Sequence, residues 1–200
     1  MNTFIGIGSD ARYKDKVKEM LSTNDIPMRW RGTPIEHFVM AQNFGYPLHP
    51  SSKPAVLIVS CMEFRYSLPV PANYAYVIRT PGGRLIGAEL AFGYVYAKGV
   101  RDILLIAHDD CGMTHLPEMA PQLIESFVIQ GWTRQNAEKF VAAEIDRLAV
   151  KDELEALESE YHRLKGLFNN VNIAPLFLTL SDKRVYLPLW YDKFIASAGN

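Results

Sequence analysis

The sequence predicts an α/β protein in which helices flank a parallel β-sheet. From Ala55 onward, short apolar runs alternate with longer stretches of helical periodicity, which is typical of such sheets. The run AVLIVS, residues 55–60, is apolar and rich in β-branched residues, as expected for a strand covered on both faces. The chain length of 200 residues suits a single domain.

The elements of this α/β core follow one another along residues 55–200. The expected strands are 55–60, 74–79, 102–108, 174–180 and 185–191, with a turn at 181–184 between the last two. The expected helices are 85–99, about 118–130 and a long amphipathic helix at about 133–165. The stretch PGG at 81–83 breaks the chain, and Gly99 and Gly131 end the first two helices.

Residues 1–54 have a different pattern and predict an N-terminal helical arm. The stretch 11–21 has helical spacing, with one side formed by Tyr13, Val17, Met20 and Leu21. The stretch 33–45 predicts a second helix, with Thr33 as N-cap, Pro34 at the first position and Gly45 after the end. Residues 46–54 are rich in proline and serine and predict an irregular connection into the core.

Composition narrows the functional classes. The formal net charge is −1, and no local basic run is present, so neither nucleic acid nor an anionic membrane is expected as a partner. No apolar stretch approaches the ~20 residues of a membrane span, and the first residues lack the pattern of a signal peptide. Two cysteines do not make a secreted disulfide scaffold. We expect a cytoplasmic location.

Both cysteines follow apolar runs that predict strands. Cys61 directly follows the run at 55–60, His108 ends the run at 102–108, and Cys111 follows His108 by three residues. Reactive groups of parallel sheets lie past the carboxyl ends of the strands, so these side chains share one edge if the two strands are neighbours. Two thiolates and one imidazole are a known zinc ligand set that leaves one position for water. We therefore predict Cys61, His108 and Cys111 as zinc ligands.

Two simpler interpretations compete with a zinc site. A single cysteine at a strand end is more often a small buried hydrophobic residue than a ligand, but three ligand-type residues at one edge weigh against that reading. A redox-active pair of Cys61 and Cys111 is the second interpretation. The sequence contains no Cys-x-x-Cys motif, which gives the redox interpretation little support.

Several stretches of the sequence resemble the motifs of a known family. CMEFR (61–65) and HDDCGM (108–113) resemble, respectively, the Cys-x-Asp-x-Arg and His-x-x-Cys-Gly motifs of the β-class carbonic anhydrases. VIRTPGG (77–83) is similar to the Val-Arg-Asn-Ala-Gly stretch after the family's second strand. GAELAFGYVYAKGVRDILLIAH (87–108) resembles the helix, Gly-Val turn and strand that precede the His-x-x-Cys. The resemblance covers residues 55–115 well and is weak over 1–54.

The resemblance implies a fold, a cofactor and a reaction. It implies a short, mostly parallel sheet with an antiparallel edge strand, in a homodimer or dimer of dimers whose N-terminal helices wrap around the partner. It implies Zn²⁺ held by Cys61, His108 and Cys111. A zinc-bound water that loses its proton near neutral pH would attack carbon dioxide and yield bicarbonate.

The resemblance also implies a catalytic dyad, in which the sequence departs from the family. Arg65 occupies the arginine position, but Glu63 occupies the position of the aspartate that orients the zinc-bound water. Glutamate is one methylene longer, and a displacement of about 1 Å can cost ~100-fold in rate. Glu63 either orients the water or ligates zinc and closes the site. A bidentate pair with Arg65 would hold it off the metal.

These observations favour reversible hydration of carbon dioxide, with Glu63 orienting the water and Arg65 positioning Glu63. One alternative is hydrolysis of carbonyl sulfide or carbon disulfide on the same scaffold. The other is an inactive zinc-binding relative with a regulatory or binding role. Asp110 is a weaker candidate for support of the metal site, and His115 is a weaker candidate for proton transfer.

Overall fold

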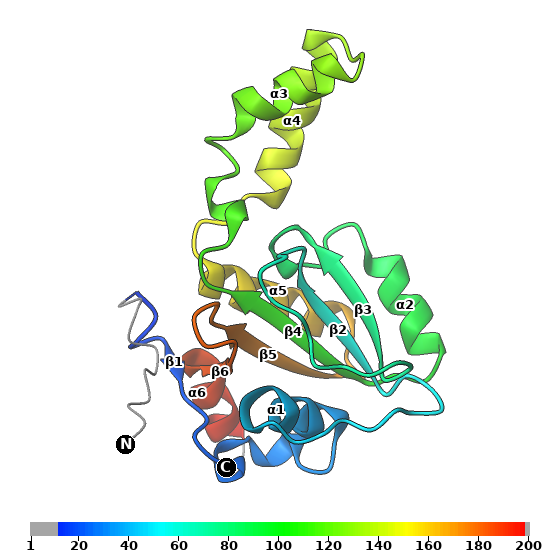
Figure 1. Cartoon of the computed structure of the whole chain (residues 1–200), viewed down its shortest axis with the longest axis vertical. Helices are drawn as coiled ribbons and strands as arrows, with labels where there is room; N and C mark the ends of the chain where they lie inside the picture. Colours follow the sequence, from blue (N-terminus) through cyan, green and yellow to red (C-terminus); the bar gives the residue numbers. More distant parts are fainter. Residues whose placement is uncertain (1–11, 199–200) are drawn as a thin grey trace.

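A six-stranded mixed sheet forms the centre of the computed structural model, which describes residues 12–198 (Figure 1). The strands are β1 (Val17–Lys18), β2 (Val56–Cys61), β3 (Ala75–Thr80), β4 (Asp102–His108), β5 (Asn172–Leu178) and β6 (Val185–Pro188). Their order is β1-β6-β5-β4-β2-β3. The pairs among β2, β3, β4 and β5 are parallel, and β6 and β1 add antiparallel pairs at one side. The prediction of a mostly parallel sheet with an antiparallel edge is confirmed.

Helices cover both faces of this sheet. The helices of the described chain are α1 (Pro34–Phe44), α2 (Glu89–Ala97), α3 (Ala120–Ile129), α4 (Arg134–Leu148), α5 (Glu153–Leu167) and α6 (Leu189–Ala198), and α3 and α4 lie apart from the sheet. α1 and α5 both contact β4 and cover its opposite faces (Figure 1). α1 confirms the helix expected at 33–45, because Pro34 is its first residue and Gly45 adopts the left-handed conformation after its end.

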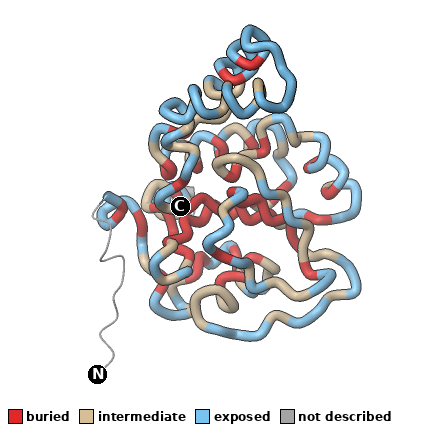
Figure 2. The backbone as a smooth tube through the Cα atoms, turned by 45° about the horizontal axis from the view of Figure 1, so that its top comes forward, coloured by how far each residue is buried: buried red, intermediate tan, exposed pale blue. Residues whose placement is uncertain are grey.

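The core lies in the central strands. Every residue of β2 is buried, and only the first residue of β4 and of β5 is less than fully buried, so buried positions concentrate in the sheet (Figure 2). Apolar residues from the N-terminal segment, including Trp30 and Phe38, belong to the same hydrophobic core. The described residues before β2 therefore pack on their own sheet. That residues 1–54 also wrap around a partner stays a prediction.

The helix expected at 11–21 is wrong. Residue 11 lies outside the described residues, residues 12–16 form turns, and Val17–Lys18 is the short strand β1. Val17 pairs with Pro188 of β6, so tertiary pairing with the sheet overrides the helical spacing of this segment. The expected inward-facing residues are buried except Leu21, and those buried are Tyr13, Val17 and Met20.

The single helix expected at about 133–165 is also wrong, because α4 ends at Leu148 and α5 begins at Glu153. Ala149 has an extended-type ψ of 143°. The Asp152 carboxylate then accepts hydrogen bonds from the backbone N–H groups of Leu154 and Glu155, which makes it the N-cap of a new helix. Apolar periodicity continues across this break, and it therefore hides the change of direction between the two helices.

Two further element boundaries differ from expectation. The last strand ends at Pro188 rather than 191, and α6 follows it directly, where no helix was expected. The helix expected at 85–99 begins only at Glu89, because Gly87 has a φ of +80°, a left-handed conformation that a regular helix excludes. Both errors arise where apolar residues continue from one element type into the next.

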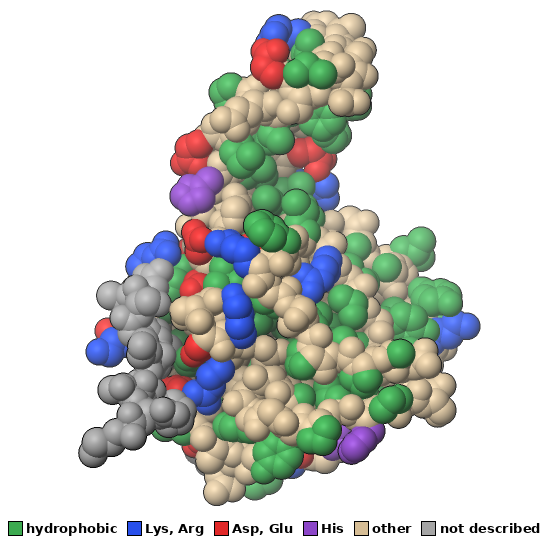
Figure 3. Space-filling view, in the orientation of Figure 1, with side chains coloured by type: hydrophobic (Ala, Val, Ile, Leu, Met, Phe, Trp, Pro, Cys, Tyr) green, Lys and Arg blue, Asp and Glu red, His purple; other side chains and the backbone are tan. Residues whose placement is uncertain are grey.

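α3 and α4 form a hairpin that projects from the core (Figure 1). The two helices contact each other far more than any other element, and α3 contains no buried residue. Phe127, Trp132 and Phe140 cluster at mutual ring distances of 5.0 to 5.3 Å, and hydrophobic side chains are visible along the hairpin surface (Figure 3). Among the described helices, none combines the length and apolar character needed to cross a membrane.

Candidate metal centre

Adjacent parallel strands place the first two candidate ligands at one edge. Ser60 of β2 pairs with Ile106 of β4, so the two strands end side by side at Cys61 and His108. The third candidate, Cys111, follows Asp110, which has a φ of 50°. This left-handed residue turns the loop sharply. The prediction that both thiols and the imidazole share one edge of the sheet is confirmed.

The three side chains form a cluster with the geometry of a metal site. The ligand atoms of Cys61, His108 and Cys111 all lie within 4.8 Å of one another, and all three residues are buried. The two Sγ atoms are 3.8 Å apart, and both thiols are free rather than joined in a disulfide. Two Zn–S bonds of ~2.3 Å at a tetrahedral angle would separate the sulfur atoms by about 3.8 Å. The donor set therefore fits a tetrahedral metal ion.

The imidazole of His108 has the orientation of a ligand. Its Nδ1 lies 2.7 Å from the backbone carbonyl oxygen of Asp109, so Nδ1–H donates to that carbonyl and Nε2 keeps its lone pair. The buried Nε2 atom makes no hydrogen bond within the described residues. An orphaned buried nitrogen costs free energy, and coordination of a cation beside the two thiols would satisfy it.

The site stabilises a thiolate even without a cation. The hydrogen bond with Cys111, together with His108 and the backbone N–H of Gly82, lowers the pKa of Cys61 to about 4. Hydrogen bonding to Cys61, with burial, raises the pKa of Cys111. One sulfur is therefore ready to ligate as a thiolate, and a cation would favour ionisation of the second.

Glycines let the turn after β3 approach the cluster. Gly83 has a φ of +67°, and a Cβ atom there would lie 2.9 Å from the carbonyl oxygen of Ile106 and 3.2 Å from the backbone nitrogen of Cys61. Gly82 also has a positive φ, and a Cβ there would meet the Val150 side chain at 3.1 Å. Both glycines therefore permit close approach of this turn to the backbone around the candidate metal cluster.

Arg65 holds Glu63 in a fixed position. Its Nε and Nη2 donate to the two carboxylate oxygens of Glu63, both at 2.7 Å, and its backbone N–H adds a third bond at 2.8 Å. These hydrogen bonds lower the pKa of Glu63 to about 2. Among the described residues, only Cys61, His108 and Cys111 meet as mutually close ligand atoms, so Glu63 lies outside the cluster.

The same arginine connects the two loops of the site. Arg65 Nη1 donates to the Asp110 carboxylate at 2.6 Å, and Nη2 donates to the Asp110 carbonyl at 2.8 Å. Asp110 therefore supports the Cys111 loop through its contacts with Arg65. His115 has a side chain that is 67% exposed beside Glu118, and it lies outside the cluster.

Sequence reasoning missed a carboxylate that touches the Cys111 loop. Glu153, the first residue of α5, accepts a hydrogen bond from the backbone N–H of Cys111 at 3.2 Å. It also lines a small cavity of about 10 Å³ beside His108 and Cys111. Its position after the Asp152 N-cap was the available signal, because acidic residues are favoured in the first turn of a helix.

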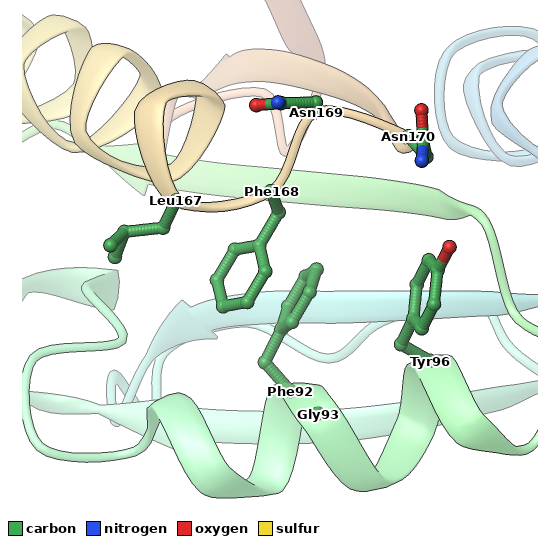
Figure 4. A pocket seen from close by; sticks show the side chains of 7 residues that line it. All are labelled: Phe92, Gly93, Tyr96, Leu167, Phe168, Asn169 and Asn170. Carbon is green, nitrogen blue, oxygen red and sulfur yellow. The ribbon is translucent and has the colours of Figure 1, made fainter.

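A larger hollow lies elsewhere on the molecule. A groove of about 210 Å³ runs between α2 and the loop after α5 (Figure 4). Phe92 and Phe168 stack there with ring centroids 3.7 Å apart. The loop leads into the start of β5, at the edge of the sheet opposite the ends of β2 and β4. This groove is therefore separate from the metal cluster.

Comparison with solved structures identifies the fold. A β-carbonic anhydrase from Trichomonas vaginalis superimposes with a TM-score of 0.57 over 74% of this chain and 91% of that chain, at 20% sequence identity. A carbonic anhydrase from Streptococcus mutans gives a TM-score of 0.54 at 21% identity, over 76% of this chain and 92% of that chain. The fold is that of the β-carbonic anhydrases.

A carbon disulfide hydrolase has a related structure, with a TM-score of 0.50 and 17% identity over 77% of this chain and 86% of that chain. No protein-family model matches the sequence, and a search of curated proteins finds no relative. The resemblance of the motifs is thus confirmed at the level of the β-carbonic anhydrase fold. The reaction has to be inferred from the residues at the metal centre.

Proposed function

We propose that this protein is a zinc enzyme that reversibly hydrates carbon dioxide to bicarbonate. The observation that carries the proposal is the buried group of Cys61, His108 and Cys111, whose ligand atoms lie within 4.8 Å of one another at the strand ends of a β-carbonic anhydrase fold. The free Nε2 of His108 and the spacing of the two sulfur atoms support a tetrahedral ion.

Three protein ligands leave one position open for chemistry. A zinc ion held there would supply Lewis acidity, which brings the ionisation of water into the neutral pH range. A fourth protein ligand would close the site and make the metal structural. Glu63 is held by three hydrogen bonds from Arg65, and this arrangement supports an open site.

Glu63 then acts as a hydrogen-bond acceptor. Its pKa of about 2, set by the Arg65 hydrogen bonds, keeps the carboxylate ionised at neutral pH, so it accepts a hydrogen bond from the attacking water and orients its lone pair. Arg65 fixes the carboxylate by bidentate contact. The Glu63 carboxylate also accepts a hydrogen bond from the backbone N–H of Arg65, and despite the additional methylene it lies outside the ligand cluster.

Two single substitutions test this assignment. Cys111→Ser is expected to lose stoichiometric zinc and activity together. Glu63→Gln is expected to keep zinc but to lower kcat by about 100-fold, the scale of a misplaced catalytic group. Metal analysis and stopped-flow hydration of carbon dioxide measure both effects. Wild-type protein that purifies without zinc and cannot be loaded with it would refute the proposal.

Hydrolysis of carbon disulfide or carbonyl sulfide is a second candidate, favoured by the structural similarity to a carbon disulfide hydrolase. The same zinc-loaded protein is assayed with each substrate. Activity toward the sulfur compounds without hydration of carbon dioxide selects this candidate. A wild type inert toward all three, beside an active Glu63→Asp variant, would instead indicate an inactive zinc-binding relative.

A further inference from the structure

Glu153 is a buried carboxylate that connects distant parts of the chain. Its residue is 6% exposed. Its Oε1 accepts a hydrogen bond from the backbone N–H of Cys111 at 3.2 Å, and its Oε2 accepts one from the hydroxyl of Tyr13 at 2.7 Å. The two partners lie 42 and 140 residues away in the sequence. A single side chain of α5 therefore joins the N-terminal segment to the loop of a candidate metal ligand.

Burial of this charge is not explained by an ion pair. Within the part of the chain that the structure describes, no lysine or arginine pairs with Glu153, and nearby Lys16 binds Asp152 instead, at 2.9 Å. A buried carboxylate held by neutral donors costs free energy relative to an exposed one. Its position in the first turn of α5 offsets part of that cost through the helix dipole.

The Cys111 loop needs support from the protein interior. Arg65 holds Asp110 from the exposed side, and Asp110 itself has a left-handed φ of 50°. On the buried side, Glu153 binds the peptide N–H of Cys111, which fixes the direction of the Cα–Cβ bond and so of the sulfur atom. A residue that orients a metal ligand in this way affects metal affinity strongly.

Tyr13 positions Glu153 in turn. Tyr13 is 2% exposed, and its ring packs on Phe177 of β5 with centroids 4.7 Å apart. The ring is therefore anchored to the sheet, and its hydroxyl reaches Glu153 from a fixed point. The first described residues of the chain thus contribute to the geometry around Cys111.

We propose that Tyr13 and Glu153 are positioning residues that set the metal affinity of the site through the Cys111 backbone. This inference rests on the proposed metal site. It extends that site to a residue of the N-terminal segment and to the first turn of α5. Both residues act through Cys111 and neither touches the substrate.

The test compares metal binding in matched variants of the full chain. Glu153→Ala removes the acceptor, Tyr13→Phe removes the anchoring hydroxyl, and Glu153→Gln keeps an acceptor for the Cys111 N–H. The control is Tyr191→Phe, which removes a buried hydroxyl that lies 3.5 Å from the carbonyl oxygen of Ile173. Zn²⁺ affinity is measured by chelator competition, and Co²⁺-loaded protein reports ligand geometry through its thiolate charge-transfer and d–d absorption.

Glu153→Ala and Tyr13→Phe are expected to raise the Kd for Zn²⁺ by about 10- to 100-fold and to shift the Co²⁺ spectrum. Glu153→Gln should recover most of the affinity, and Tyr191→Phe should keep the wild-type Kd. If Glu153→Ala does not fold, Tyr13→Phe decides the question. The inference is overturned if Tyr13→Phe keeps the wild-type Kd for Zn²⁺ and the wild-type Co²⁺ spectrum. It is also overturned if Tyr191→Phe loses as much Zn²⁺ affinity as Tyr13→Phe. Failure of the wild type to bind either metal would overturn the proposed function as well.

Discussion

At the residue scale, a carboxylate that could close the metal site is held away from it by its own neighbour. Glu63 has one more methylene than the aspartate of the resembled motif, so it could reach the metal. Its two oxygens are instead occupied by Nε, Nη2 and the backbone N–H of Arg65. The guanidinium also binds Asp110, so one residue fixes both the candidate acceptor and the loop before Cys111.

Gly83 is expected to be required for the close packing of the turn after β3 against β2 and β4. Gly83→Ala would force a left-handed φ of +67° on a residue with a Cβ atom placed 2.9 Å from the Ile106 carbonyl oxygen. Because this neighbour is backbone, relief requires movement of β4 or of the turn. We expect a loss of about 1–3 kcal/mol in the free energy of unfolding, measured by urea denaturation of metal-free protein.

Gly93→Ala is the matched control for this substitution. Gly93 lies in α2, and a Cβ there would meet nothing within 4 Å. Alanine at an unstrained helix position is more favourable than glycine by about 0.5–1 kcal/mol. Equal stability changes in the two variants would contradict the argument from close approach at Gly83.

The sequence predicts part of the candidate metal centre and misses another part for a physical reason. Cys61, His108 and Cys111 are recognisable because each lies at or just after the end of a buried strand, and parallel strands bring their carboxyl ends together. The N-cap at Asp152 places Glu153 in the first turn of a helix, but its contact with Tyr13 joins positions 140 residues apart. Local spacing contains no information about such a contact.

At the scale of elements, apolar periodicity identifies helices and strands better than it identifies where they end. The helical spacing over 133–165 is real, but Asp152 divides it into α4 and α5. The division matters for the candidate site, because α5 begins at Glu153, the residue that binds the Cys111 backbone. The helical spacing over 11–21 is misleading, because β1 forms by pairing with β6, a contact that local spacing does not encode.

The α3–α4 hairpin is expected to be dispensable for the core. The backbone N–H of Val150 donates to the Met113 carbonyl at 3.1 Å, so the chain closes at the base of the hairpin. Replacement of residues 116–147 by a short glycine–serine linker should preserve the fold and zinc stoichiometry. A shorter loop also lowers the closure cost, by about 0.6 kcal/mol for each halving of length.

Circular dichroism, urea unfolding and metal analysis of the shortened chain check this expectation. The control replaces α1, residues Pro34–Phe44, with a similar linker. This helix contributes Ile35, Phe38 and Val39 to the buried core, so its loss should unfold the protein. Loss of zinc from a folded shortened chain would show that the hairpin supports the metal centre.

At the scale of the whole molecule, the candidate metal centre lies at one edge of a core that other elements close. The buried strands β2, β4 and β5 are enclosed by helices and by the N-terminal segment. The candidate ligands only extend this core at one edge. This organisation differs from that of small zinc-binding domains, which are unfolded without metal.

Metal removal is therefore expected to lower stability without abolishing the fold. A ligand that binds only the native state stabilises it by about 4 kcal/mol when its free concentration is 1,000 times the Kd. Excess chelator should lower the free energy of unfolding of zinc-loaded wild type by a corresponding amount, seen as a lower urea midpoint. The far-ultraviolet circular dichroism without urea should stay native. Cys61→Ser should show no dependence of its midpoint on zinc. A core closed by β2, β4 and β5 should stay folded without the ion. Unfolding caused by chelation alone would contradict this argument and would mean that the edge cluster organises the core.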